Sequence, residues 1–215
     1  MRSHRVVSSA VERLVYTEDV GGSKPSPPTS FTKILLGNRL KIRTFKATDD
    51  FVSENLPAIR NLLSDAYEDD FSEQDWLHTC NGIRFLGTFD NAIVAHGAVV
   101  PREILINGQS LEVGYLEGIA VSREYQGQGI GGLLLKSISD FSFSQYQLSM
   151  LSTDEFDFYS KYGWKKFSGK SGVIIKGEIK MTPDEDEGLM YLIGSSGSFE
   201  EIHTAYCDFR GGDFW

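Results

Sequence analysis

A glycine-rich loop in the middle of the chain constrains the fold more than any other feature. Its residues are Gln126-Gly127-Gln128-Gly129-Ile130-Gly131-Gly132, and it connects an apolar strand to a leucine-rich helix. Such a junction gathers unpaired backbone N–H groups and the positive end of a helix dipole around an anion. Glycines suit it because a side chain would hold a phosphate away from the amides. The loop therefore predicts a binding site for a phosphorylated ligand.

The same glycines also fit a second phosphate-binding pattern. Gly127, Gly129 and Gly132 satisfy the G-x-G-x-x-G of dinucleotide-binding folds, where the glycines follow the first strand of a βαβ unit and an acid lies on the next strand. Here the loop follows several predicted strands, and the strand expected at 146–151 ends without an acid. The context argues against a dinucleotide fold, and a plain glycine-rich turn is the other alternative.

Hydrophobic periodicity predicts strands on both sides of this loop. Strands are expected at 38–45, 83–88, 93–101, 103–106, 111–121, 146–151, 173–179 and 188–193. Helices are expected at about 50–63, 72–79, 129–143 and 154–162. Asn107-Gly108 is a hairpin signal. This order predicts an α+β domain with a mixed, mostly antiparallel sheet flanked by helices.

The length and composition favour one domain with an extension. We expect residues 1–35, which include the linker-like stretch 21–28, to be a flexible extension, and residues 36–215 to form the domain. No run of roughly 20 apolar residues and no secretory signal is present, so we expect a cytoplasmic protein without a membrane span. Acids at 12, 18 and 19 argue against the alternative of a transit peptide. Cys80 and Cys207 have no partners at metal spacing, which predicts neither a disulfide framework nor a metal site.

The net charge of −9 is concentrated in two acidic stretches. One covers 65–75, and the other covers 181–215, where Arg210 is the only basic residue. An acidic surface repels phosphate backbones and attracts polycations, so we expect no nucleic-acid partner. A surface that only keeps the protein soluble is the simpler alternative.

The strand before the glycine loop belongs to a longer sequence motif. Gly118-Ile119-Ala120-Val121, followed by Gln126-x-x-Gly129-x-Gly131 and a leucine-rich helix, resembles the acetyl-CoA motif of the GNAT family, (Arg/Gln)-x-x-Gly-x-(Gly/Ala). The resemblance implies the GNAT acyl-CoA N-acyltransferase fold and acetyl-CoA as the acetyl donor. The loop would hold the pyrophosphate of coenzyme A, and the strand would meet its pantetheine arm and thioester. The cofactor-binding residues it implies are Ile119, Ala120, Val121, Gln126, Gly127, Gln128, Gly129, Ile130 and Gly131.

Five further blocks narrow the resemblance. They cover 68–79, 114–118, 146–152, 159–164 and the ending 206–215, and together they resemble the aminoglycoside 2'-N-acetyltransferases over about 36–215. The extension has no counterpart. The acceptor contacts implied are Asp70, Asp75, Glu117, Gly118, Ser152, Asp186, Asp213 and the terminal carboxylate of Trp215. The acids suit a polycationic sugar, because ammonium groups bind carboxylates by charge-assisted hydrogen bonds. Four adjacent acids at 184–187 leave the choice of Asp186 open.

The resemblance also implies roles in the chemistry. The amine must be neutral to attack and the leaving thiolate must be protonated. Glu117 would accept the proton of the amine, directly or through water, and Tyr159 would act as the general acid toward the coenzyme A sulfur. The N–H of Val121 would polarise the thioester carbonyl. Direct attack by the amine needs no nucleophilic cysteine.

Three functions fit the sequence. They are an antibiotic-resistance enzyme that acetylates the 2'-amine of aminoglycosides, a GNAT enzyme for another amine such as a polyamine or amino sugar, and an acyl-CoA-binding module without activity. Family likeness also makes a homodimer an expectation. Of the histidines, His78 is expected to be a hydrogen-bonded helix residue or to line the acceptor cleft, and His96 to be a core residue.

Overall fold

The computed structural model describes residues 39–68 and 71–215. The predicted extension at 1–35 and the predicted acceptor contact Asp70 lie outside the described residues. The helices are α2 (Asp50–Tyr67), α3 (Glu73–His78), η2 (Arg123–Tyr125), α4 (Ile130–Gln145), α5 (Phe156–Ser160) and α6 (Pro183–Asp186). The strands are β1 (Leu40–Lys46), β2 (Ile83–Phe89), β3 (Ala92–Ile106), β4 (Gln109–Val121), β5 (Leu148–Ser152), β6 (Lys165–Lys166), β7 (Lys170–Ile175), β8 (Glu178–Met181), β9 (Leu189–Ile193) and β10 (Thr204–Asp208).

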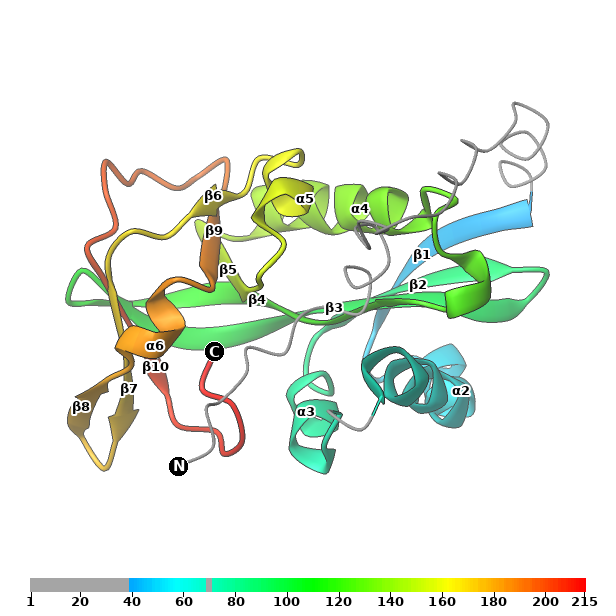
Figure 1. Ribbon diagram of the computed structural model, residues 1–215, viewed down its shortest axis with the longest axis horizontal. Helices are drawn as coiled ribbons and strands as arrows, with labels where there is room; N and C mark the ends of the chain where they lie inside the picture. The colour runs from blue at the N-terminus through cyan, green and yellow to red at the C-terminus, as the bar shows by residue number, and fades with distance from the viewer. Residues whose placement is uncertain (1–38, 69–70) are drawn as a thin grey trace, which may run out of the picture.

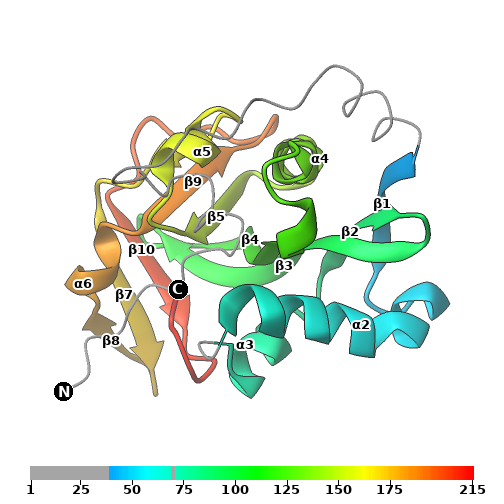
Figure 2. The ribbon, with the colours of Figure 1, turned by 45° about the vertical axis from the view of Figure 1, so that its right-hand side comes forward.

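The strands form one mixed sheet, as predicted. Its order is β6-β9-β5-β4-β3-β10-β7-β8, and β2 pairs with both β3 and β1. All pairs are antiparallel except β4 with β5 and β10 with β7. The helices α4 and α5 cover one face, and α2 and α3 lie against the other (Figures 1 and 2). None of the helices in the described part of the chain is long and apolar enough to cross a membrane.

The β3–β4 hairpin confirms one turn and corrects one strand boundary. Asn107 and Gly108 both have positive φ angles, 49° and 81°, at the tip of the hairpin. The predicted break at Pro101 is wrong, because β3 runs through it. On one edge of β3, β2 pairs only as far as Val99 and β10 begins only at Ile104. Pro101, which has no N–H, therefore lies where none of the described strands covers that edge.

The later part of the chain differs most from the prediction. The strand expected at 173–179 is the hairpin β7–β8, which turns at Lys176 and Gly177. The helix expected at 154–162 is shorter, and the elements β6, α6 and β10 were not predicted. β10 lies between β3 and β7 in the middle of the sheet, although it comes last in the chain. Its position depends on long-range pairing that local sequence patterns do not report.

Two apolar layers fix the central strands. On one face, Ile130, Leu134 and Ile138 of α4 are buried in a cluster with residues of β3 and β4. On the other face, Ile59 and Leu63 of α2 belong to a cluster that also contains side chains of β2 and β4. Burial on both sides stabilises the sheet through the hydrophobic effect. The sheet is thereby a rigid platform for the carboxyl ends of β4 and β5.

Candidate active site

The parallel strands β4 and β5 separate part-way along their length. They pair only where Gly114 lies opposite Ser149 and Tyr115 opposite Met150. Beyond this point both strands continue without pairing with each other. A pocket lies at this divergence and is lined by residues of both strands, of α2, α3 and α5, and of the C-terminal segment.

A bulge in β4 shapes the floor of the pocket. Gly118 and Ile119 together lie opposite the single residue Gly97 of β3. Gly118 has a φ of 60°, and a Cβ there would lie 2.9 Å from Cγ2 of Thr79. The hydroxyl of Tyr67 donates to the carbonyl of Ile119 at 3.0 Å. The bulge therefore needs glycine at its first position, and α2 holds its second position in place.

The buried residue His96 holds the bulge from behind. Nη1 of Arg84 lies 2.6 Å from its Nε2, and its Nδ1 lies 2.7 Å from the carbonyl oxygen of Gly118. A guanidinium only donates hydrogen bonds, so Nε2 accepts and Nδ1 carries the proton. Burial and then the charge of Arg84 lower the pKa of His96 to about 3. His96 is the expected core residue, and it is also a neutral support for the bulge.

The amide of Val121 points away from β3. The N–H of Ser122 donates to the carbonyl of Val94 at 2.8 Å, which makes that pair a hydrogen-bonded one. Pairs alternate along an antiparallel ladder, so the next pair, Ala95 with Val121, is not hydrogen-bonded. The backbone groups of Val121 therefore face the side of β5, where its carbonyl accepts from Nε2 of Gln126 at 2.8 Å. The Val121 N–H has the orientation that its predicted role requires.

The glycine loop presents an uncapped helix N-terminus. Gly127 and Gly129 have φ angles of 70° and 83°, and a Cβ at either position would meet nothing within 4 Å. Glycine is therefore favoured by the backbone angles rather than by crowding. The N-cap residue of α4 is Gly129, which has no side chain to cap the amides at the start of the helix. Open amides at the positive end of a 16-residue helix fit an anionic group.

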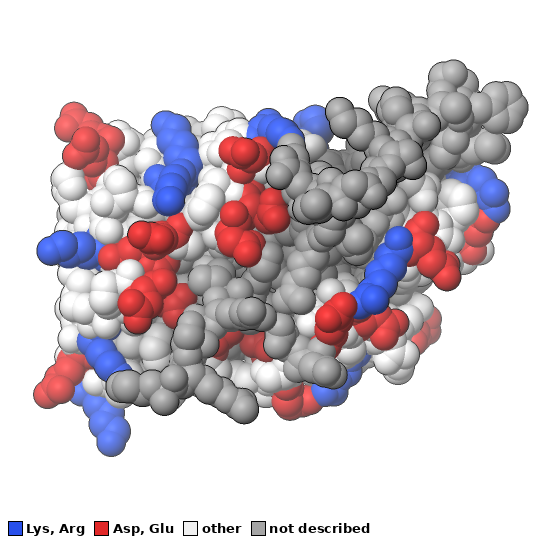
Figure 3. All heavy atoms as spheres, viewed as in Figure 1, with Lys and Arg blue, Asp and Glu red and all other residues white. Residues whose placement is uncertain are grey.

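The pocket brings together most of the predicted acceptor and catalytic residues. They come from four elements and from the C-terminal segment, which lie far apart in the sequence. Those that line it are Asp75, Glu117, Gly118, Ser152, Tyr159, Asp213 and Trp215, and the predicted cofactor-binding residue Ile119 lines it as well. Figure 3 shows several clusters of acidic side chains on the face of the molecule that it draws. Carboxylates around one concave site can bind several ammonium groups of a single ligand.

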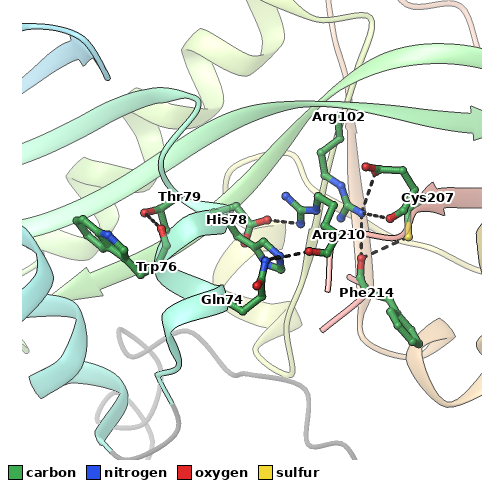
Figure 4. Close-up of polar contacts among 10 residues, drawn as sticks. Gln74, Trp76, His78, Thr79, Arg102, Cys207, Arg210 and Phe214 are labelled. Atoms are coloured by element: carbon green, nitrogen blue, oxygen red, sulfur yellow. Dashed lines mark hydrogen bonds and ion pairs between the residues drawn. The ribbon is translucent and has the colours of Figure 1, made fainter. Parts of the chain in front are cut away.

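An ion pair joins Glu117, which lines the pocket, to the C-terminal segment. Nη2 of Arg210 donates to Oε1 of Glu117 at 2.7 Å, and both side chains are largely buried. The backbone carbonyl of Arg210 accepts from Nε2 of Gln74 on α3 at 2.9 Å (Figure 4). Gly211 and Gly212 follow with positive φ angles and pack against Gln74. Arg210 thus connects the C-terminal segment, α3 and β4 around the predicted base.

Comparisons with known proteins agree with this geometry. Residues 49–167 match the model of the acetyltransferase (GNAT) domain. An aminoglycoside 2'-N-acetyltransferase from Mycolicibacterium fortuitum is 33% identical over 173 residues, which cover 78% of this chain and 89% of that relative. The chain belongs to the aminoglycoside 2'-N-acetyltransferase family of GNAT acetyltransferases.

Solved structures confirm the GNAT fold. A GNAT family N-acetyltransferase (YhbS) from Escherichia coli, in complex with CoA, superposes with a TM-score of 0.54 at 16% identity over 91% of this chain and 98% of its own. ElaA from Escherichia coli superposes with a TM-score of 0.52 at 15% identity over 71% of this chain and 99% of its own. The predicted fold class is therefore correct.

Seven of the nine cofactor-side residues predicted for this GNAT acetyltransferase fall into two groups. Gln126, Gly127, Gln128 and Gly129 form the loop, in which Nε2 of Gln128 donates to the carbonyl of Glu124 at 3.1 Å. The side chains of Ala120 and Ile130 are buried in the core, and Gly131 is buried in the first turn of α4. A contact of these three residues with a cofactor would therefore use their backbone.

Two predicted residues have additional structural roles in the acetyltransferase. Asp75 lines the pocket and also forms the capping box of α3, where one of its oxygens accepts from both the amide and the hydroxyl of Ser72 at 2.7 Å. Trp215 lines the pocket, and its Nε1 donates to the hydroxyl of Thr182 at 3.2 Å. The fold itself therefore fixes where these residues lie in the pocket.

Asp186 is not brought into the pocket of the acetyltransferase. Its Oδ1 accepts from the amide of Ser171 at 2.6 Å, so it ties α6 to β7. It is absent from the described residues that line the pocket. Its role in acceptor binding stays a prediction, as does that of Asp70.

The structure adds residues that the sequence did not single out. Tyr115 lines the pocket, and Arg210 holds Glu117. His78, for which the sequence left a place in the cleft as one alternative, lines the pocket as well, and burial and then the charge of Arg210 lower its pKa. The position of Arg210 in an otherwise acidic stretch could have marked it as a residue that pairs with an acid. Nothing in the local sequence pointed to its partner, because the two residues are 93 positions apart.

Proposed function

We propose that the protein transfers the acetyl group of acetyl-CoA to the 2'-amine of an aminoglycoside. The observation that carries the proposal is the shared pocket. Asp75, Glu117 and Asp213 line it together with Tyr159, where β4 and β5 diverge. Carboxylates suit a polycationic acceptor, and a hydroxyl at the divergence suits the leaving group. The 33% identical relative, which bears this activity in its name, supports the choice of acceptor.

The residues on the cofactor side fit coenzyme A. The uncapped amides of α4 and the open loop around Gly127 and Gly129 suit a pyrophosphate. The divergence of β4 and β5 leaves the backbone of Val121 directed away from β3, where an extended amide-containing arm can bind. When bound, acetyl-CoA supplies the thioester whose carbonyl carbon is attacked.

The residues of the chain divide the proton transfers between them. Glu117 accepts the proton that the amine loses as its nitrogen bonds to the acetyl carbon. The N–H of Val121 donates to the carbonyl oxygen as negative charge develops on it. Tyr159, which is almost fully buried on α5, donates its proton to the sulfur as the carbon–sulfur bond breaks. The products are the acetylated amine and coenzyme A.

Direct attack without an acyl-enzyme is part of the proposal. Cys207 is buried, and its thiol donates to the carbonyl of Phe214. Burial raises the pKa of the Cys207 thiol, which disfavours the nucleophilic thiolate. The variant Cys207→Ala is therefore expected to retain turnover, and complete loss of turnover in a folded variant would favour a covalent route.

Release of free coenzyme A tests the proposal. The assay compares gentamicin, which carries a 2'-amine, with kanamycin A, which carries a 2'-hydroxyl, at equal acetyl-CoA concentration. We expect turnover with gentamicin and little with kanamycin A. If neither aminoglycoside is turned over but a polyamine is, the proposed acceptor is wrong and the assignment as an acetyltransferase still holds. Acetyl-CoA binding without turnover of any amine would favour a module without activity.

A further inference from the structure

The hydroxyl of Tyr115 is a buried polar group at the pocket for which the described residues provide no partner. Tyr115 precedes Glu117 by two positions on β4, so both side chains project from the same face of the strand. It lines the pocket, and its relative exposure is 1%. Its hydroxyl makes no hydrogen bond in the described structure. An unpaired buried hydroxyl is unfavourable, so its position at a binding pocket suggests a ligand atom as its partner.

Ser152 on β5 also has a buried hydroxyl at the pocket. It lies at the end of β5 and lines the same pocket, and its Oγ is also buried without a partner among the described residues. Two residues with neutral, buried hydroxyl groups therefore line the pocket together with Asp75, Glu117 and Asp213. The pocket offers partners both for ammonium groups and for neutral oxygen atoms.

The surroundings of Tyr115 keep its hydroxyl protonated. Burial and then the charge of Glu117 raise the pKa of Tyr115 well above its ordinary value. The guanidinium carbons of Arg102 and Arg210 lie 4.8 Å and 6.0 Å from the centre of its ring, where cation–π attraction holds the ring in place. The hydroxyl is therefore a fixed donor rather than a base.

We propose that the Tyr115 hydroxyl determines acceptor specificity by donating a hydrogen bond to a hydroxyl or ring oxygen of an amino sugar. This inference rests on the proposed function, and it names the residue that recognises the uncharged oxygen atoms of the acceptor. A linear polyamine can satisfy the carboxylates, but its methylene groups would cover the Tyr115 hydroxyl and leave it unpaired. A site built to bond a substrate oxygen discriminates against a ligand that lacks one.

The variant Tyr115→Phe tests the inference, because it removes one oxygen atom and keeps the ring. Steady-state coenzyme A release gives the KM for gentamicin, and inhibition of that reaction by spermidine gives its Ki. We expect the KM for gentamicin to rise about tenfold, as for the loss of one hydrogen bond. The Ki of spermidine is expected not to rise. The midpoint of thermal unfolding is expected to stay the same or to increase, since the hydroxyl has no partner in the fold.

Ser149→Ala is the matched control. Ser149 is a second β5 serine whose buried Oγ lacks a partner among the described residues, but it does not line the pocket. Its removal is expected to leave both constants unchanged.

Two results would overturn the inference. One is an unchanged KM for gentamicin in Tyr115→Phe, and the other is an equal rise in the KM for gentamicin and the Ki of spermidine. Either leaves the proposed function intact if the wild-type protein acetylates gentamicin. A wild-type protein that does not acetylate gentamicin overturns both proposals.

Discussion

The guanidinium of Arg210 lies 2.7 Å from a carboxylate oxygen of Glu117, which is one of the residues that line the pocket. A cation of the protein thereby neutralises the predicted base and fixes its orientation. Gln74 holds the backbone of Arg210, so the arrangement depends on the packing of the C-terminal segment against α3. The proposed acceptor site is therefore built jointly by β4 and by a segment that is distant in sequence.

Arg210→Gln is expected to lower kcat more than it weakens acceptor binding. Glu117 loses its orienting partner, while the pocket becomes more acidic and attracts a polycation more strongly. We expect kcat to fall about tenfold, as for the loss of one charge-assisted hydrogen bond, with an unchanged or lower KM for the acceptor. Arg210→Lys should recover part of kcat. A raised KM with an unchanged kcat would show that Arg210 has no influence on Glu117 in the reaction.

Asp213→Asn and Asp186→Asn separate two predicted acceptor contacts. Asp213 lines the pocket, so loss of its charge is expected to raise the acceptor KM about tenfold or more. The affinity for acetyl-CoA should change little. Asp186 accepts from the amide of Ser171, which an asparagine oxygen can still do, so its variant should leave the KM unchanged. Steady-state kinetics of both variants checks this prediction. A raised acceptor KM for Asp186→Asn would assign Asp186 to the acceptor site as well.

Gly118→Ala and Gly108→Ala separate backbone strain from the shape of the site. Both glycines have positive φ, which costs alanine about 1–2 kcal/mol. A Cβ at position 108 meets nothing within 4 Å, whereas one at position 118 crowds Thr79. We expect similar losses of stability from strain, with an additional loss and a large fall in kcat only for Gly118→Ala. Equal kinetics for the two variants would show that the bulge does not matter for turnover.

The buried histidine predicts how stability depends on pH. His96 has a pKa of about 3 in the folded protein against an ordinary value of 6.5, so the unfolded chain binds a proton more readily. Its contribution is fully present above pH 6.5 and is lost as the pH falls toward 3, with a slope of about 1.4 kcal/mol per pH unit. Urea unfolding between pH 6 and pH 5 should give a slope that is steeper in the wild type than in His96→Gln by about this amount. Identical slopes would mean that folding does not lower the pKa of His96.

The local features of this fold were predictable, and the long-range ones were not. The Asn107-Gly108 turn and the glycine loop follow from backbone angles that few residues adopt. The place of β10 between β3 and β7 depends on pairing across the whole chain. Pro101 suggested a break, yet β3 continues because none of the strands in the described residues covers that edge at the proline.

The same division holds for the site. Acids could be assigned to the acceptor side because a family resemblance and the charge of the acceptor agree. The partners of those acids could not, since the contact of Arg210 with Glu117 joins distant segments. The support of Gly118 by His96 was also hidden, because a histidine in an apolar strand has the pattern of an ordinary core residue.

The position of the acetyl group on the product tests the central claim most directly. Gentamicin would be incubated with the protein and acetyl-CoA, and the product would be purified and its acetylated nitrogen located by NMR spectroscopy. Acetylation at the 2'-nitrogen alone is the predicted result. Acetylation at any other nitrogen, or an unmodified antibiotic after complete incubation, would contradict the account.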